Sequence, residues 1–409
     1  MAAWLASTAV SAFAAASDST VAAPPAEKVA SRSAWETAAS VPTTILLAPF
    51  YIVTKGAGAV VGVVEQTRIV NKTLDFLVAD DGSRSIFPTY DGKTGFGARY
   101  VQRNLAGKGS RLAVTATAGL NERRYVEAAL DRVPLGSPRL TGRVTALHFF
   151  WSDEPFFGVG QDTDESDETS YALEQTSAQL AVTWNPQARI AVDANLVYDH
   201  NDAGPGGDPN SSTTQDPTLA GVPDRVNLMQ LRLGFLRDGL DHPGRPTKGS
   251  AIACVASVVA PTEDQDLGFM RFEADVSRYV HLFHGRTLRL RAAASVAEPF
   301  SGNQIPFYEL AELGGRETLR GFERGRFHDQ GSLLGSVEYR YPIQPRLMDA
   351  VFFADVGRVF ADLGKDEVED AVHSNFGVGL RAWDRGGVLM TFDVGFSREG
   401  TFVKFAFNP

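Results

Sequence analysis

Two acidic residues, Glu338 and Asp355, form a pair that could hold a cation inside this protein. They lie in two consecutive segments, 332–342 and 347–359, in which polar and apolar residues alternate. Alternate residues of a β-strand point to opposite faces. The residues that share their faces are Ser336 and Arg340 for Glu338, and Phe353 and Gly357 for Asp355. Two carboxylates on neighbouring strands, both facing inward, would form a receptor for one guanidinium group.

The guanidinium could come from either of two places. The connection before the first segment contains Arg320-Gly321-Phe322, and a charged group that folds away from water needs a partner. In that arrangement Gly321 would let the backbone turn tightly against the wall and Phe322 would fill the adjacent gap. In the alternative, Arg320 stays in solvent and the carboxylates pair with Arg340 and Arg358.

The sequence contains no recognisable catalytic or metal-binding constellation. Its 7 histidines are scattered, and neither H-E-x-x-H nor G-x-S-x-G occurs. The single cysteine, Cys254, excludes an internal disulfide framework and a multi-cysteine zinc site. The acidic stretch 161–169 lacks the glycine and final glutamate of a calcium loop, which favours a solvated loop. We therefore expect a protein that is not an enzyme and that uses no metal and no cofactor.

Short alternating segments, which would position the two carboxylates, recur from residue 84 to the end of the chain. We identify sixteen of them, from 84–89 to 401–408. Arginines and carboxylates recur on one face of the segments, while the other face is almost uncharged, as in RTLRLRAAASV at 286–296. A soluble sandwich would also alternate, but a charged face opposite an apolar one is typical of a water-filled lumen facing lipid.

The connections and the composition favour the same fold. Long polar connections follow the fifth, seventh, eleventh and thirteenth segments, whereas most even-numbered connections are tight turns, an asymmetry typical of outer-membrane barrels. Aromatic residues at segment ends, such as Trp184, Tyr198 and Trp383, are expected at the membrane interface. A mean hydropathy of −0.12 argues against a polytopic helical membrane protein. The net charge of −10 gives no support for nucleic-acid binding. The sequence thus predicts an all-β transmembrane antiparallel β-barrel of about 16 strands over residues 84–409.

The N-terminal region is expected to serve export rather than to form part of the barrel. Residues 1–16 form a small-residue apolar run that ends in an A-x-A-like site, although no Lys or Arg precedes it, and we interpret them as a signal peptide. Residues 17–42, rich in Ala, Ser and Pro, read as a flexible linker. Residues 43–83 are predicted to form a short helical segment in the periplasm, because Pro49, Lys55 and three glycines make membrane insertion marginal.

The stretch FYELAELGGRETLRGFERGRF at 307–327, with the segments after it, resembles the barrel of the BamA/TamA-like family of outer-membrane assembly factors (bacterial surface antigen type). The markers are Arg320-Gly321-Phe322 as the R-G-F/Y tip of the family's sixth extracellular loop, then Glu338, then Phe353, Asp355 and Gly357 in the F-x-D-x-G pattern. The resemblance covers about residues 84–409. It implies that Arg320 folds into the lumen and contacts Glu338, Asp355 or both.

The resemblance implies a location in the bacterial outer membrane and a role in protein assembly or translocation there. A weak seam between the first and last strands would then template client strands through its unpaired backbone edge. The expected partners are outer-membrane lipids, client barrel proteins and a soluble periplasmic accessory protein, with no nucleic acid. Full assembly factors carry POTRA domains, and the segment between the signal and the barrel is too short for one. That difference favours the alternative, a passive channel or structural barrel plugged by the long loop.

Overall fold

The computed structural model describes residues 83–407, with gaps at 92, 120–121, 208–223, 243, 264, 345–346, 363–371 and 384–386. The predicted signal peptide 1–16, the linker 17–42 and, apart from Ser83, the helical segment 43–83 lie outside the described residues. Within the described part of the chain, no helix has the length and apolar character needed to cross a membrane.

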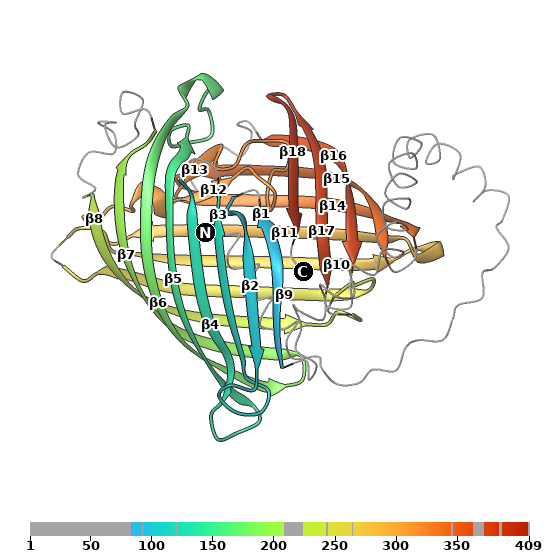
Figure 1. Ribbon diagram of the computed structural model, residues 1–409. Helices are drawn as coiled ribbons and strands as arrows, with labels where there is room; N and C mark the ends of the chain where they lie inside the picture. Colours follow the sequence, from blue (N-terminus) through green and yellow to red (C-terminus); the bar gives the residue numbers. More distant parts are fainter. Residues whose placement is uncertain are drawn as a thin grey trace. The chain divides into compact units, whose positions relative to one another are not determined.

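A closed antiparallel barrel of sixteen strands forms the described part of the chain, as predicted (Figure 1). Each strand pairs with the next one along the chain, except that β11 pairs with β14 and β18 closes on β1. The barrel strands are β1 (Arg84–Asp91), β2 (Gly95–Arg103), β3 (Arg111–Ala118), β4 (Arg124–Pro134), β5 (Leu140–Phe156), β6 (Thr169–Gln187), β7 (Ile190–Pro205), β8 (Arg225–Asp238), β9 (Gly249–Pro261), β10 (Phe269–His281), β11 (Thr287–Pro299), β14 (Gly331–Gln344), β15 (Met348–Phe360), β16 (His373–Trp383), β17 (Val388–Ser397) and β18 (Gly400–Phe407).

The wall of the barrel has an apolar outside and a charged inside. In β8, Leu231 and Leu233 are 51% and 57% exposed, while Arg232 between them is 7% exposed and lines the lumen. Large apolar side chains exposed in this alternating order are what a lipid-facing wall requires. The alternation that predicted the strands is therefore confirmed as the division between lipid and lumen.

The connection between β11 and β14, residues 300–330, is here called loop 6. It contains a short 3-10 helix, η6 (Phe307–Glu309), and a two-stranded sheet of β12 (Ala311–Leu313) and β13 (Phe327–Asp329). Residues of loop 6 line the lumen cavity together with the inner faces of the strands. The small sheet was not predicted, because three-residue strands leave no readable alternation.

One aromatic residue lies where the sequence did not place it. Trp184 and Tyr198 are exposed on the outside, as expected, but Trp383 is buried and lines the lumen cavity. Its ring lies 5.7 Å from the guanidinium of Arg245 and 5.3 Å from that of Arg340. The prediction that Trp383 belongs to an interface girdle is wrong, because these inward-facing arginines give its ring a partner inside the barrel.

Candidate functional site: the loop 6 lock and the barrel seam

Glu338 and Asp355 are placed by the pairing of β14 with β15. Ser336 pairs with Asp355, and Glu338 pairs with Phe353, so all four side chains lie on the lumen face. Both carboxylates are buried, at 6% and 2% exposure. A buried carboxylate requires compensating hydrogen bonds or a counter-charge.

Arg320 of loop 6 supplies that counter-charge. Its Nη1 lies 2.9 Å from Glu338 Oε2, its Nη2 lies 2.8 Å from Asp355 Oδ1, and its Nε donates to Asp355 Oδ2 at 2.9 Å. The guanidinium also lies over the ring of Phe353, 3.6 Å from its centroid. Burial opposes the charged form, but the hydrogen bonds and the charge of Asp355, and then the charge of Glu338, raise the pKa of Arg320 above its ordinary value. We call Arg320 and the three residues that it contacts here, Glu338, Phe353 and Asp355, the loop 6 lock.

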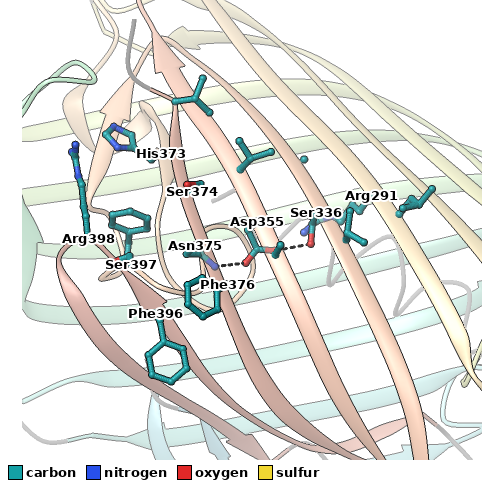
Figure 2. A pocket seen from close by; sticks show the side chains of 17 residues that line it. Arg291, Ser336, Asp355, His373, Ser374, Asn375, Phe376, Phe396, Ser397 and Arg398 are labelled. Atoms are coloured by element: carbon teal, nitrogen blue, oxygen red, sulfur yellow. Dashed lines mark hydrogen bonds between the residues drawn. The ribbon is translucent and has the colours of Figure 1, made fainter. Parts of the chain in front are cut away.

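Asp355 is the centre of the lock and accepts hydrogen bonds from three elements. The Ser336 hydroxyl donates to it at 2.7 Å from β14, and the Asn375 amide donates at 3.0 Å from β16 (Figure 2). The backbone N–H of Arg320 donates to it from loop 6 at 3.3 Å. A carboxylate with this many donors is held in one orientation.

The glycines of the two motifs allow the loop to lie directly on the wall. A Cβ on Gly321 would come 2.5 Å from Asn375 Cβ, and a Cβ on Gly357 would come 2.9 Å from Leu313 Cδ1. Gly321 is therefore required for close approach, and its φ lies outside the left-handed region. The expected tight fit against the wall is present without a special turn at this residue.

Phe322 fills an apolar site beside the lock. It is fully buried in a cluster with Leu313, Leu319, Phe327, Leu334 and Val359. Its ring centroid lies 5.3 Å from that of Phe327 and 5.9 Å from that of His373. The loop tip is thus held by apolar packing as well as by charge.

The structure brings together all seven residues named from the sequence: Arg320, Gly321, Phe322, Glu338, Phe353, Asp355 and Gly357. Sequence reasoning missed Ser336 as a donor, Asn375, and Arg381, whose Nη2 lies 3.5 Å from Glu338 Oε2. In the alternative, Arg340 and Arg358 would have paired with the carboxylates while Arg320 stayed in solvent, but Arg320 binds both carboxylates and Arg340 Nη2 donates to the backbone carbonyl of Pro246.

Three further arginines of loop 6 also reach the barrel, and sequence reasoning did not single them out. Arg316 binds Asp91, Arg324 binds Glu154, and Arg326 binds Glu399, at 2.7, 2.5 and 3.0 Å. Four arginines within eleven residues, 316–326, were a visible signal of a loop that needs several carboxylate partners. Their partners are far away in sequence, so the pairing itself was not readable.

The seam between β1 and β18 is the second feature of the site. In the described residues, the two strands pair only at Tyr90 with Phe407 and at Asp91 with Ala406, whereas β17 pairs with β18 at eight positions. A hydrogen bond of 3.3 Å from Thr89 Oγ1 to the Phe407 carbonyl adds to the seam. Figure 1 shows β1 and β18 meeting at their ends. Among the described residues, the edge of β18 from Gly400 to Phe405 has no strand on its β1 side.

A lumen cavity of about 880 Å³ remains beside loop 6. Arginines and carboxylates from most of the barrel strands line it, as the sequence predicted for a wet interior. In the described ranges, no group of three or more His, Cys, Asp or Glu residues could hold a metal ion.

Comparison with known proteins agrees with this architecture. A model of the Omp85 superfamily domain matches residues 104–408. The fold is similar to that of BamA from Haemophilus ducreyi lacking POTRA domains 1–3, with a TM-score of 0.60 and 16% identity, over 80% of this chain and 69% of that one.

Two CdiB structures are also similar in fold. CdiB from Escherichia coli matches with a TM-score of 0.54 and 13% identity, over 79% of this chain and 62% of that one. CdiB from Acinetobacter baumannii matches with a TM-score of 0.50 and 12% identity, over 79% and 58%. This chain therefore spans about three fifths of either CdiB chain. The family match covers most of the chain and the barrel has the expected lipid-facing wall, so the chain belongs to the Omp85 superfamily and is a β-barrel of the bacterial outer membrane.

Proposed function

We propose that this barrel assists the assembly or translocation of client proteins at the outer membrane, without enzymatic chemistry of its own. The observation that carries the proposal is the seam, where β1 and β18 share two paired positions in the described residues. Backbone N–H and C=O groups that face hydrocarbon without a partner cost several kcal/mol each. The free edge of β18 therefore favours the addition of another strand.

A client would use this edge by strand addition. An extended segment that pairs with Gly400–Phe405 would satisfy the unpaired backbone groups, and its alternating side chains would face lipid and lumen in turn. Client barrel proteins are the partners that this geometry favours, with a soluble periplasmic protein to deliver them. The lock supports the same function, because it fixes loop 6 to β14 and β15, four and three strands away from β18.

The test is to close the seam covalently in the cell. Tyr90→Cys with Phe407→Cys, in a Cys254→Ala background, places two thiols at directly paired positions, where Cα atoms lie about 4.5–5.5 Å apart, within disulfide reach. Deletion of the gene should lower the outer-membrane level of at least one other barrel protein. The oxidised variant should fail to restore that level, and reduction should rescue it.

A matched control uses the same chemistry at a fully paired junction. Val258→Cys with Met270→Cys joins β9 to β10 at positions that already pair and face outward. This variant should restore client levels whether oxidised or reduced. If gene deletion leaves every other barrel protein unchanged, and the purified barrel gives steady conductance in planar bilayers, the protein is a passive channel and the proposal is wrong.

A further inference from the structure

Loop 6 contacts the strands on both sides of the seam, and the first of these contacts is made by Arg316. Its Nη1 lies 2.7 Å from Asp91 Oδ2, and Asp91 is one of the two residues through which β1 pairs with β18. The neighbouring Glu317 is itself held, because Arg291 of β11 donates to its backbone carbonyl at 2.6 Å. The end of β1 is thus bound to a part of loop 6 that is anchored elsewhere in the wall.

The second contact is made by Arg326 on the other side of the seam. Its Nε lies 3.0 Å from Glu399 Oε2, in the turn that leads directly into β18, and both side chains are buried. Arg326 also donates to the hydroxyl and the carbonyl of Thr163, at 2.8 and 2.7 Å. Arg326 is thus held by Thr163 independently of Glu399, and the ion pair joins the β17–β18 hairpin to loop 6.

We infer that loop 6 acts as a clamp across the seam, holding β1 through Arg316–Asp91 and the β17–β18 hairpin through Arg326–Glu399. Arg320, which lies between Arg316 and Arg326 in the sequence, binds β14 and β15. The two strands share two paired positions in the described residues, so these ion pairs add a second link between the two sides of the seam, which passes through loop 6. The inference rests on the proposed function for its purpose, since a clamped seam would release β1 and β18 when a client strand arrives.

Hydrogen exchange of the whole protein in lipid nanodiscs tests the clamp, because exchange reports local opening segment by segment. Asp91→Asn removes a partly exposed pair and should speed exchange in 84–91 about two- to fivefold. Glu399→Gln breaks a buried pair and should speed exchange in 400–407 about tenfold or more. Both substitutions alter the barrel partner and leave the loop arginines in place.

The matched control is Glu309→Gln, which removes the carboxylate partner of Arg271 on β10, a buried loop 6 pair away from the seam. It should leave exchange in 84–91 and 400–407 as in the wild type. If Glu309→Gln fails to fold, Asp202→Asn, which breaks the exposed pair with Arg225, takes its place. Seam exchange that stays at the wild-type rate in Asp91→Asn and Glu399→Gln, or that rises equally in the control, overturns the clamp. The two proposals can fail separately. If seam exchange is faster in the variants but gene deletion leaves client levels unchanged, the clamp is supported and the proposed function is wrong.

Discussion

The lock and the seam lie in the same barrel and are held together in opposite ways. At the lock, Arg320 has two carboxylate partners, Asp355 has donors from three elements, and a buried apolar cluster surrounds Phe322. At the seam, two paired positions and a few side-chain contacts hold β1 to β18 in the described residues. The difference predicts that the wall stays fixed at the lock and separates, if anywhere, at the seam.

Loop 6 therefore has two different attachments, one to β14 and β15 and one to the strands at the seam. The β14–β15 side provides a rigid base, since breaking it would leave charges buried without partners. On the seam side, the Arg316–Asp91 pair is partly exposed and contributes little, whereas Arg326–Glu399 is a buried pair that opening must break. A barrel that must open sideways without losing its fold needs both regions.

The largest expected effect comes from Arg320→Ala, which removes the shared cation from Glu338 and Asp355. In a wet lumen the loss would be about 1–2 kcal/mol because water screens charge. The side chains of Arg320 and Asp355 are 8% and 0% exposed, so we expect about 3–5 kcal/mol, the range for a broken buried pair. The measurement is proteolysis at 299–331 and heat-modifiable mobility on gels. Arg278→Gln, on the outer face, should behave as wild type in both assays.

Phe322→Ala should loosen the same loop through packing instead of charge. Removing a fully buried phenyl ring from the cluster with Leu319 and Phe327 leaves a cavity, which costs about 3 kcal/mol. Proteolysis at 299–331 should again accelerate. If this variant resists proteolysis as the wild type does while Arg320→Ala is cleaved, the lock is held by charge alone. The lock and the seam would then differ less in how they are stabilised.

Gly321→Ala tests the close approach of the loop tip to β16. The new Cβ would overlap Asn375 Cβ at 2.5 Å, so either the loop or the wall must shift, at about 1–3 kcal/mol. We expect intermediate loop protection, between wild type and Arg320→Ala. Gly204→Ala is the matched control, since its φ also lies outside the left-handed region and nothing lies within 4 Å of the added Cβ. Equal loop protection in Gly321→Ala and wild type would show that the contact is easily relaxed.

The smallest effect on overall stability is expected from Asp91→Asn. A partly exposed pair contributes about 0.2–1 kcal/mol, so heat-modifiable mobility should match the wild type even though the seam opens faster. Faster local opening at the seam without a loss of global stability would distinguish the seam from the lock most clearly. A marked loss of folded barrel in Asp91→Asn would mean that the seam is a structural element like the lock.

The sequence by itself determined the wall. A period of two along each segment decides which side chains face lipid and which face the lumen, so the sixteen strands and the inward direction of Glu338 and Asp355 were readable from local order alone. The R-G-F tip and the F-x-D-x-G pattern each occupy a few consecutive residues, and they were identified through the resemblance to the BamA/TamA-like family.

Only the tertiary structure decided which arginine meets which carboxylate. Arg316 and Asp91 are 225 residues apart, and many carboxylates on the inward faces were equally plausible partners. The offset of β1 against β18, the small β12–β13 sheet and the inward position of Trp383 likewise depend on how the barrel closes and how loop 6 fills it. Alternation fixes the face of a residue, but closure of the sheet fixes its neighbours across the lumen, and no local pattern carries that information.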